Sequence, residues 1–167
     1  MSEEFKLKAI HADAIPEALI TAEKYRLLNE PVQAESICRD ILRIDPQNQP
    51  ALQIIILVLT DQFSKLQTSP GARTARDYAA RLADAYLRSY YLGLICERQA
   101  RALLSGMGGK FAYDGFREAM DHFEEAEKIR PSGHDDAILR WNSCVRTIRR
   151  HKLRPRSKEE EQEMFLE

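Results

Sequence analysis

Apolar residues recur at every third or fourth position through most of the chain, which is the spacing of a helix face. The first such stretch covers residues 14–48 and is interrupted at Asn29-Glu30-Pro31. It ends at Asp45-Pro46, because a residue that precedes proline is disfavoured in the helical conformation. The pattern therefore predicts two amphipathic helices joined by a short turn.

Three further stretches continue the helical pattern. Residues 50–63 are almost continuously apolar, as expected for a helix buried between neighbours. A loop over 63–71 precedes a predicted helix over 72–86. Because no glycine or proline separates that helix from the next, we place the boundary between them near 87–89.

The end of the first stretch is repeated later in the chain. When the sequence is shifted from Ala34 to Ala119, four more pairs of similar positions coincide. These pairs are Cys38 with Phe123, Ile41 with Ala126, Ile44 with Ile129 and Pro46 with Pro131. Residues 116–131 are thus a second copy of a closing helix. Its opening helix contains Leu92-Gly93, and a longer connection at residues 105–115 joins the two.

The first unit resembles the tetratricopeptide repeat, a helical hairpin of about 34 residues. The resemblance rests on Ala18, Ala22, Tyr25, Ala34, Ile41 and Pro46. Asn29 stands where the family usually has glycine, and Thr21-Ala22 replaces its Leu-Gly pair. The resemblance implies an all-α, right-handed superhelical array of antiparallel helix hairpins. We expect about three hairpins (14–48, 49–86 and 87–131) and a capping helix (134–152), flanked by a charged lead-in (1–13) and an acidic tail (153–167).

Composition is that of a folded protein. Of 167 residues, 44% are hydrophobic, and 31% are charged but balance to a net charge of -1, so bulk attraction to a polyanion is excluded. Cys38, Cys96 and Cys144 form no C-x-x-C pair, so we expect buried, reduced thiols in a cytoplasmic protein. The charged first residues predict no signal peptide, and the longest apolar run, 54–59, is too short to span a membrane.

No motif predicts catalysis, a cofactor or a metal. The glycine-rich run 106–110 lacks two features of a phosphate-binding loop: the earlier glycine would fall at Leu104, and Phe111 follows the lysine. His122, His134 and His151 are not spaced to bring two imidazoles to one helix face, and the sequence indicates no histidine partner for a cysteine. We predict a non-enzymatic protein, in which the loop 105–115 is a connection or a partner-binding element.

Basic residues concentrate in segment 140–158, the cationic run. It contains Arg140, Arg146, Arg149, Arg150, Lys152, Arg154, Arg156 and Lys158. This density suits phosphate binding, and a nucleic-acid-associated protein is our alternative interpretation. However, the run lacks interleaved aromatic residues, since Trp141 is assigned to the core. A solvated or protein-facing role is therefore favoured over nucleic acid.

The acidic tail ends in Met164-Phe165-Leu166. Such tails are commonly disordered. A second interpretation is that these apolar residues dock in a groove of this or a neighbouring molecule while the glutamates pair with the cationic run. The sequence therefore allows a homo-oligomer formed through the tail or through an end of the array.

The resemblance implies binding of other proteins along a concave face formed by the opening helices. The candidate partner-binding residues on this face are Leu19, Glu23, Arg26, Gln53, Leu57, Tyr90, Leu94, Glu97 and Arg98. Leu57 and Leu94 fit the core equally well, because their helices are very apolar. One subtype of the family clamps a peptide carboxylate with lysine and asparagine, and Leu19 and Glu23 replace these. We predict a scaffold or adaptor that binds a peptide or helical segment of a partner protein.

Overall fold

The computed structural model describes residues 4–63, 70–104 and 107–165. Within these ranges eight α-helices and two short 3-10 helices (η1, Ala12–Ala14; η2, Met107–Phe111) make up the regular structure, and no strand occurs. The expected all-α class is confirmed. The α-helices are α1 (Ile15–Leu27), α2 (Pro31–Ile44), α3 (Gln49–Asp61), α4 (Pro70–Ala80), α5 (Ala85–Leu103), α6 (Ala112–Lys128), α7 (Asp136–Arg150) and α8 (Lys158–Met164).

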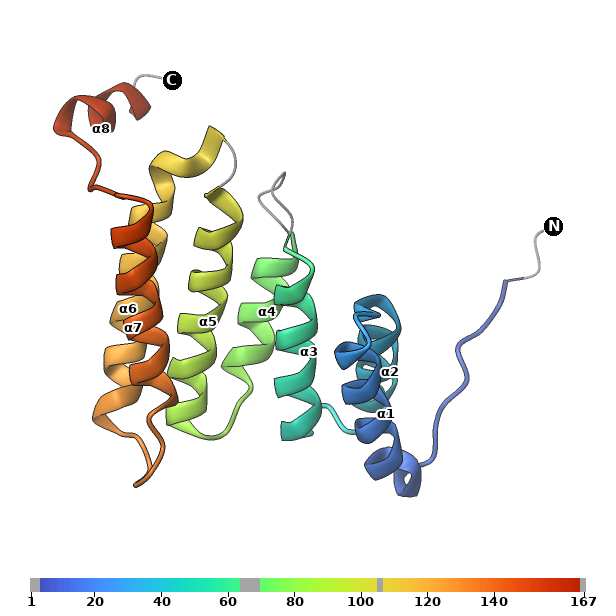
Figure 1. Ribbon diagram of the computed structural model, residues 1–167. Helices are drawn as coiled ribbons and strands as arrows, with labels where there is room; N and C mark the ends of the chain where they lie inside the picture. Colours follow the sequence, from blue (N-terminus) through green and yellow to red (C-terminus); the bar gives the residue numbers. More distant parts are fainter. Residues whose placement is uncertain (1–3, 64–69, 105–106, 166–167) are drawn as a thin grey trace.

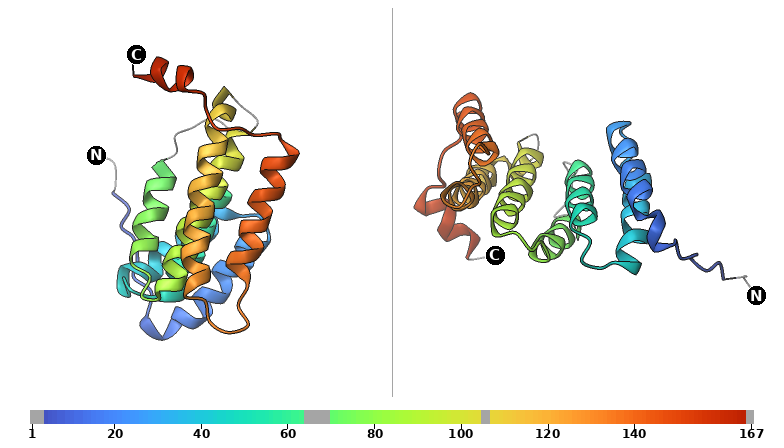
Figure 2. Two further views of the ribbon diagram at one scale, coloured as in Figure 1. Left: turned by 90° about the vertical axis from the view of Figure 1, so that its left-hand side faces the viewer. Right: turned by 90° about the horizontal axis from the view of Figure 1, so that it is seen from below.

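Helices α1 to α7 pack in sequence, each against the next (Figure 1). A second set of contacts links alternate helices, because α1 touches α3, α3 touches α5 and α5 touches α7. In Figure 1, α1, α3 and α7 accordingly lie in front of α2, α4 and α6, and the views of Figure 2 show the same division. The odd-numbered helices therefore share one side of the molecule.

The predicted turn between α1 and α2 is confirmed. Asn29 adopts a left-handed conformation with φ 60°. Its N–H donates to the carbonyl of Arg26 (3.0 Å), and the N–H of Glu30 donates to that of Tyr25 (2.9 Å). This is a Schellman helix ending, in which asparagine takes the place of the usual glycine. Pro31 then begins α2, where it needs no hydrogen-bond partner for its nitrogen.

The predicted boundary near 87–89 is wrong. Helix α4 ends at Ala80 and α5 begins at Ala85, so Tyr86 belongs to α5 and not to the preceding helix. Asp84 starts α5, because its carboxylate accepts a hydrogen bond from the N–H of Leu87 (2.9 Å). Arg88 stabilises the same turn by donating to the carbonyls of residues 82 and 83. The break is thus encoded by an aspartate cap, without glycine or proline.

The prediction of a loop over residues 105–115 is also wrong over most of that range. Residues 105–106 lie outside the described ranges, but η2 covers 107–111 and α6 begins at Ala112. Gly115 is therefore a helical residue. A Cβ atom at this glycine would lie 2.9 Å from the Cβ of Ala100, so α6 crosses α5 closely here.

The tail contains a short helix. Ser157 and Glu160 form a capping box at the start of α8, with N–H to side-chain distances of 3.3 and 2.8 Å. Phe165 is 91% exposed, so it does not dock in a groove of its own chain, and Leu166 lies outside the described residues. The ion pairs found for the cationic run join Arg140 to Glu97 and Arg156 to Asp114, and do not involve the glutamates of α8.

The core consists of two hydrophobic clusters that meet on α5. The first extends from α1 to α5 and the second from α5 to α7, and Tyr90 packs against both. Helix α3 is buried over most of its surface, with eight buried residues, as its continuous apolar sequence predicted. No helix in the described ranges has the length and hydrophobicity needed to cross a membrane.

Candidate functional site

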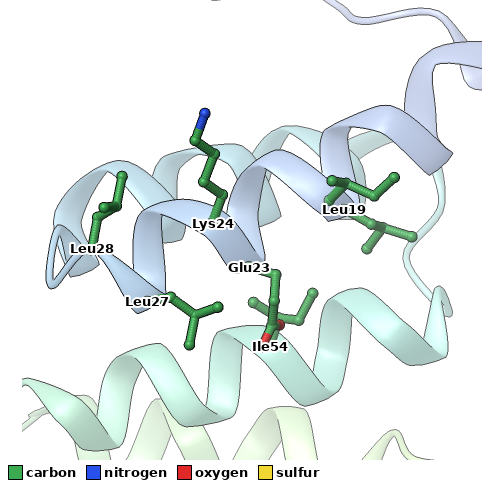
Figure 3. Close-up of a pocket in the computed structure, with 7 residues that line it drawn as sticks. Leu19, Glu23, Lys24, Leu27, Leu28 and Ile54 are labelled. Carbon is green, nitrogen blue, oxygen red and sulfur yellow. The ribbon is translucent and has the colours of Figure 1, made fainter.

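A largely apolar groove lies along α1 and is bordered by Ile54 of α3. Its volume is about 580 Å³. It is lined by Leu19, Ile20, Glu23, Lys24, Leu27, Leu28 and Ile54. Figure 3 shows Glu23 and Leu27 pointing from α1 toward α3, whereas Lys24 and Leu28 point away from α3. Two predicted partner-binding residues, Leu19 and Glu23, therefore belong to this groove.

Much of the apolar lining is open to solvent. Leu27 is 75% exposed, Ile20 63% and Leu28 57%. Residues 4–9 are exposed and run away from the helices, so in the described chain they leave this face of α1 largely uncovered (Figure 1). Several large apolar side chains exposed together on one helix indicate an interaction surface more strongly than scattered ones do. The sequence predicted none of these three as partner-binding residues. Ile20 and Leu27 stand outside the apolar face predicted for the first helix, whereas Leu28 was placed on that face and is nevertheless exposed.

An ion-pair network joins α1, α3 and α5. Asp61, the last residue of α3, accepts a hydrogen bond from Nε of Arg26 on α1 (2.8 Å) and pairs with Arg98 on α5. The predicted partner-binding residues Arg26 and Arg98 therefore meet at one carboxylate. Their side chains remain 19% and 24% exposed, so they border the surface while they hold α1, α3 and α5 together.

The other predicted partner-binding residues lie deeper. Gln53 is half-buried and accepts a hydrogen bond from the hydroxyl of Tyr91 (3.3 Å), and Leu57 is half-buried against the first cluster. Leu94 is fully buried, which places it in the core, the alternative that the sequence left open. Tyr90 is half-buried and stacks on Tyr86, with ring centroids 6.1 Å apart. These four residues therefore lie below the surface formed by the odd-numbered helices and support it.

Glu97 is a fully buried carboxylate between α5 and α7. Its Oε1 accepts hydrogen bonds from Nε and Nη2 of Arg101 (3.1 and 2.9 Å), and Arg101 also donates to Oγ of Ser143 (2.9 Å). Nη1 of Arg140 lies 3.5 Å from Oε2 and forms an ion pair with it, but within the described structure Oε2 accepts no hydrogen bond. Glu97 was predicted to face a partner protein. It is instead buried and connects α5 to α7.

The cationic run is divided between internal and exposed residues. Arg140 pairs with Glu97, and Arg156 pairs with Asp114 at 2.7 Å. The other six basic residues are exposed, and no ion pair is found for them within the described ranges. Trp141 packs against the second hydrophobic cluster, as predicted. The exposed cations extend from the end of α7 to the start of α8.

The three cysteines are buried and not paired in disulfides, as predicted. Burial raises the pKa of Cys38 and of Cys144 to about 12. It raises the pKa of Cys96 to about 11, with Glu118 adding to the rise and Arg76 opposing it. All three thiols are therefore protonated at neutral pH, and none has the lowered pKa of a catalytic nucleophile.

One cysteine nevertheless belongs to a cluster of metal-ligand types. The ligand atoms of Cys96 on α5 and of Glu118 and His122 on α6 all lie within 4.8 Å of one another. The sequence alone indicates that two of these residues lie close together, because Glu118 and His122 are four residues apart and so share a helix face. Cys96 joins them only through the packing of α5 on α6, and no local sequence pattern contains that contact.

The chain is thus defined by its fold as an all-α protein of sequentially packed helices with an apolar groove at one end. No protein-family model, curated protein or solved structure matches it.

Proposed function

We propose that this chain is a non-enzymatic interaction module that binds a partner protein in the groove between α1 and α3. The observation that carries the proposal is the exposure of Ile20, Leu27 and Leu28 around that groove. An amphipathic helix with leucine, phenylalanine or methionine anchors at three- or four-residue spacing fits such a surface. At its rim, Glu23 and Lys24 offer one charge of each sign for setting the partner's orientation.

We further propose that the helices form a tetratricopeptide-like superhelical array. Its hairpins would be α1–α2, α3–α4 and α5–α6, with α7 as the capping helix. Support comes from the contacts of α1 with α3, α3 with α5 and α5 with α7, which suit opening helices that line a concave side. The motif residues of the first hairpin agree, since Ala22 of α1 and Ala34 of α2 are fully buried in the first hydrophobic cluster. Three buried free thiols suit a cytoplasmic location.

Peptide selection tests the binding proposal. The intact chain is used to select peptides from a displayed random library, and their affinities are measured by fluorescence anisotropy. Leu27→Glu places a charge in the groove, and Ile129→Glu is the matched control, because Ile129 is 52% exposed beyond α6. We expect selected peptides to bind Leu27→Glu at least tenfold more weakly and Ile129→Glu unchanged. Equal binding by all three proteins would refute the groove as the binding site.

The exposed part of the cationic run supports a second candidate function, association with nucleic acid. Six basic residues, for which the described part of the chain contains no ion pair, could contact phosphates along a strand. The test is anisotropy with fluorescent single-stranded RNA and duplex DNA at two salt concentrations. Binding that weakens with salt and is lost in Arg149→Glu, Arg150→Glu would support this function. Binding that the double variant leaves intact would reject it.

A further inference from the structure

Two close contacts between α5 and α6 flank the Cys96 cluster. A Cβ atom at Gly93 would lie 2.6 Å from the ring of Phe123, and one at Gly115 would lie 2.9 Å from Ala100. Cys96 lies between residues 93 and 100 on α5, and Glu118 and His122 lie between residues 115 and 123 on α6. The glycines therefore let the two backbones approach on both sides of the cluster and fix the register that brings the three side chains together.

These side chains supply the three donor types that zinc prefers: a thiolate sulfur, an imidazole nitrogen and a carboxylate oxygen. Tetrahedral zinc with bond lengths of about 2.0–2.3 Å places its ligand atoms roughly 3.5 Å apart. The present separations, within 4.8 Å, close to that value by small rotations of the side chains. Cys96 is 2% exposed, whereas Glu118 is exposed and His122 half-buried, so an ion can approach the cluster from the side of α6.

Arg76 of α4 lies next to the sulfur of Cys96. Its Nη2 lies 3.9 Å from the sulfur of Cys96 and donates to Oε1 of Gln99 (2.7 Å). This guanidinium stabilises negative charge on the sulfur and is itself held in place by Gln99. A thiolate and a carboxylate together carry two negative charges, so a divalent cation remains attracted to the cluster with Arg76 beside it.

We propose that Cys96, Glu118 and His122 form a binding site for a divalent zinc-type cation. A water molecule completes the four-coordinate geometry. Binding replaces the thiol proton, so one proton is released for each ion that forms a metal–sulfur bond. The site joins α5 to α6, and the bound ion stabilises the native chain against unfolding.

Cobalt titration of the intact chain, prepared without a histidine tag, tests the proposal. Co²⁺ reports a bound thiolate through a charge-transfer absorption band. We expect the band to saturate at one equivalent, to disappear when Zn²⁺ is added, and to be absent in Cys96→Ser. Cys144→Ser is the matched control, because Cys144 is equally buried but lies outside the cluster. His134→Ala removes an exposed histidine outside the cluster and likewise leaves the titration unchanged.

Glu118→Gln is a second variant that tests the site even if Cys96→Ser does not fold, because Glu118 is exposed. We expect this variant to keep the native circular dichroism spectrum and to bind Co²⁺ at least tenfold more weakly. Zn²⁺ should raise the melting temperature of the unaltered chain and raise that of Glu118→Gln less. A missing band in the unaltered chain, or a band that persists in Cys96→Ser, overturns the proposal. Equal Co²⁺ affinities of the unaltered chain and Glu118→Gln also overturn it.

Discussion

Gly93 of α5 lies directly against the ring of Phe123 of α6. A Cβ atom at Gly93 would be 2.6 Å from Cε1 and 2.7 Å from Cδ1 of this fully buried ring. No side chain larger than hydrogen fits without displacing the phenylalanine. The position thus explains why glycine, a poor helix former, is found in the middle of α5.

Gly93→Ala should therefore destabilise the protein. The overpacked contact costs about 1–3 kcal/mol, and the better helix propensity of alanine returns about 1 kcal/mol. We expect a net loss of up to about 2 kcal/mol, measured by urea unfolding. Gly109→Ala is the control, because the nearest atom to its Cβ would be 3.7 Å away. If Gly93→Ala is as stable as the control, the close approach of α5 and α6 is incorrect.

Removing the buried carboxylate of Glu97 should be costly. Glu97→Ala leaves Arg101 and Arg140 without their shared partner between α5 and α7. Both arginine side chains are about one third exposed and can recover part of their hydration, so we expect a loss of about 2–3 kcal/mol. Asp121→Ala, which breaks an exposed pair with Arg117, should cost less than about 1 kcal/mol in the same unfolding assay. Equal losses would show that Glu97 does not link α7 to α5.

Asp61 should control the attachment of α1. Asp61→Ala removes the carboxylate that Arg26 of α1 and Arg98 of α5 share. We expect faster amide hydrogen exchange in α1, with a smaller change in α6 and α7, because stability is local and α1 is an end helix. Glu125→Ala breaks a pair with Lys128 inside α6 and serves as the control. Unchanged exchange in α1 would argue against the network.

Helix α8 should lose order in acid. The hydrogen bonds that Glu160 accepts from Ser157 at the capping box lower the pKa of its carboxyl below the ordinary value of 4.5. Because this carboxyl has a lower pKa in the folded chain, its ionised form stabilises the helix at pH values above the ordinary pKa. This stabilisation is lost as the pH falls through the pKa of the folded chain. Amide chemical shifts of α8 should therefore move toward coil values below about pH 4.5, and in Ser157→Ala they should be coil-like already at neutral pH. Shifts that do not change with pH would contradict the capping role.

The sequence predicted those parts of the fold that depend on local chemistry. The turn at Asn29–Pro31 and the burial of α3 follow from residues near in sequence. The start of α5 was placed too late because Asp84 marks it with a cap alone, and an isolated aspartate is common on surfaces. The Cys96–His122 relation depends on how closely α5 approaches α6, and no local pattern contains that distance. The groove was half predicted, since Leu19 and Glu23 follow from the repeat pattern whereas the exposure of Leu27 depends on what covers α1.

The proposed binding of a partner segment in the groove is tested most directly by nuclear magnetic resonance of the intact, isotope-labelled chain. A peptide selected on the unaltered protein is titrated in, and backbone amide shifts are followed. We predict that the largest changes cluster on α1 and α3 around Leu19, Leu27 and Ile54, and that α6 changes little. Changes concentrated on α6 or on the cationic run, with α1 unaffected, would contradict the assignment of the groove as the binding site.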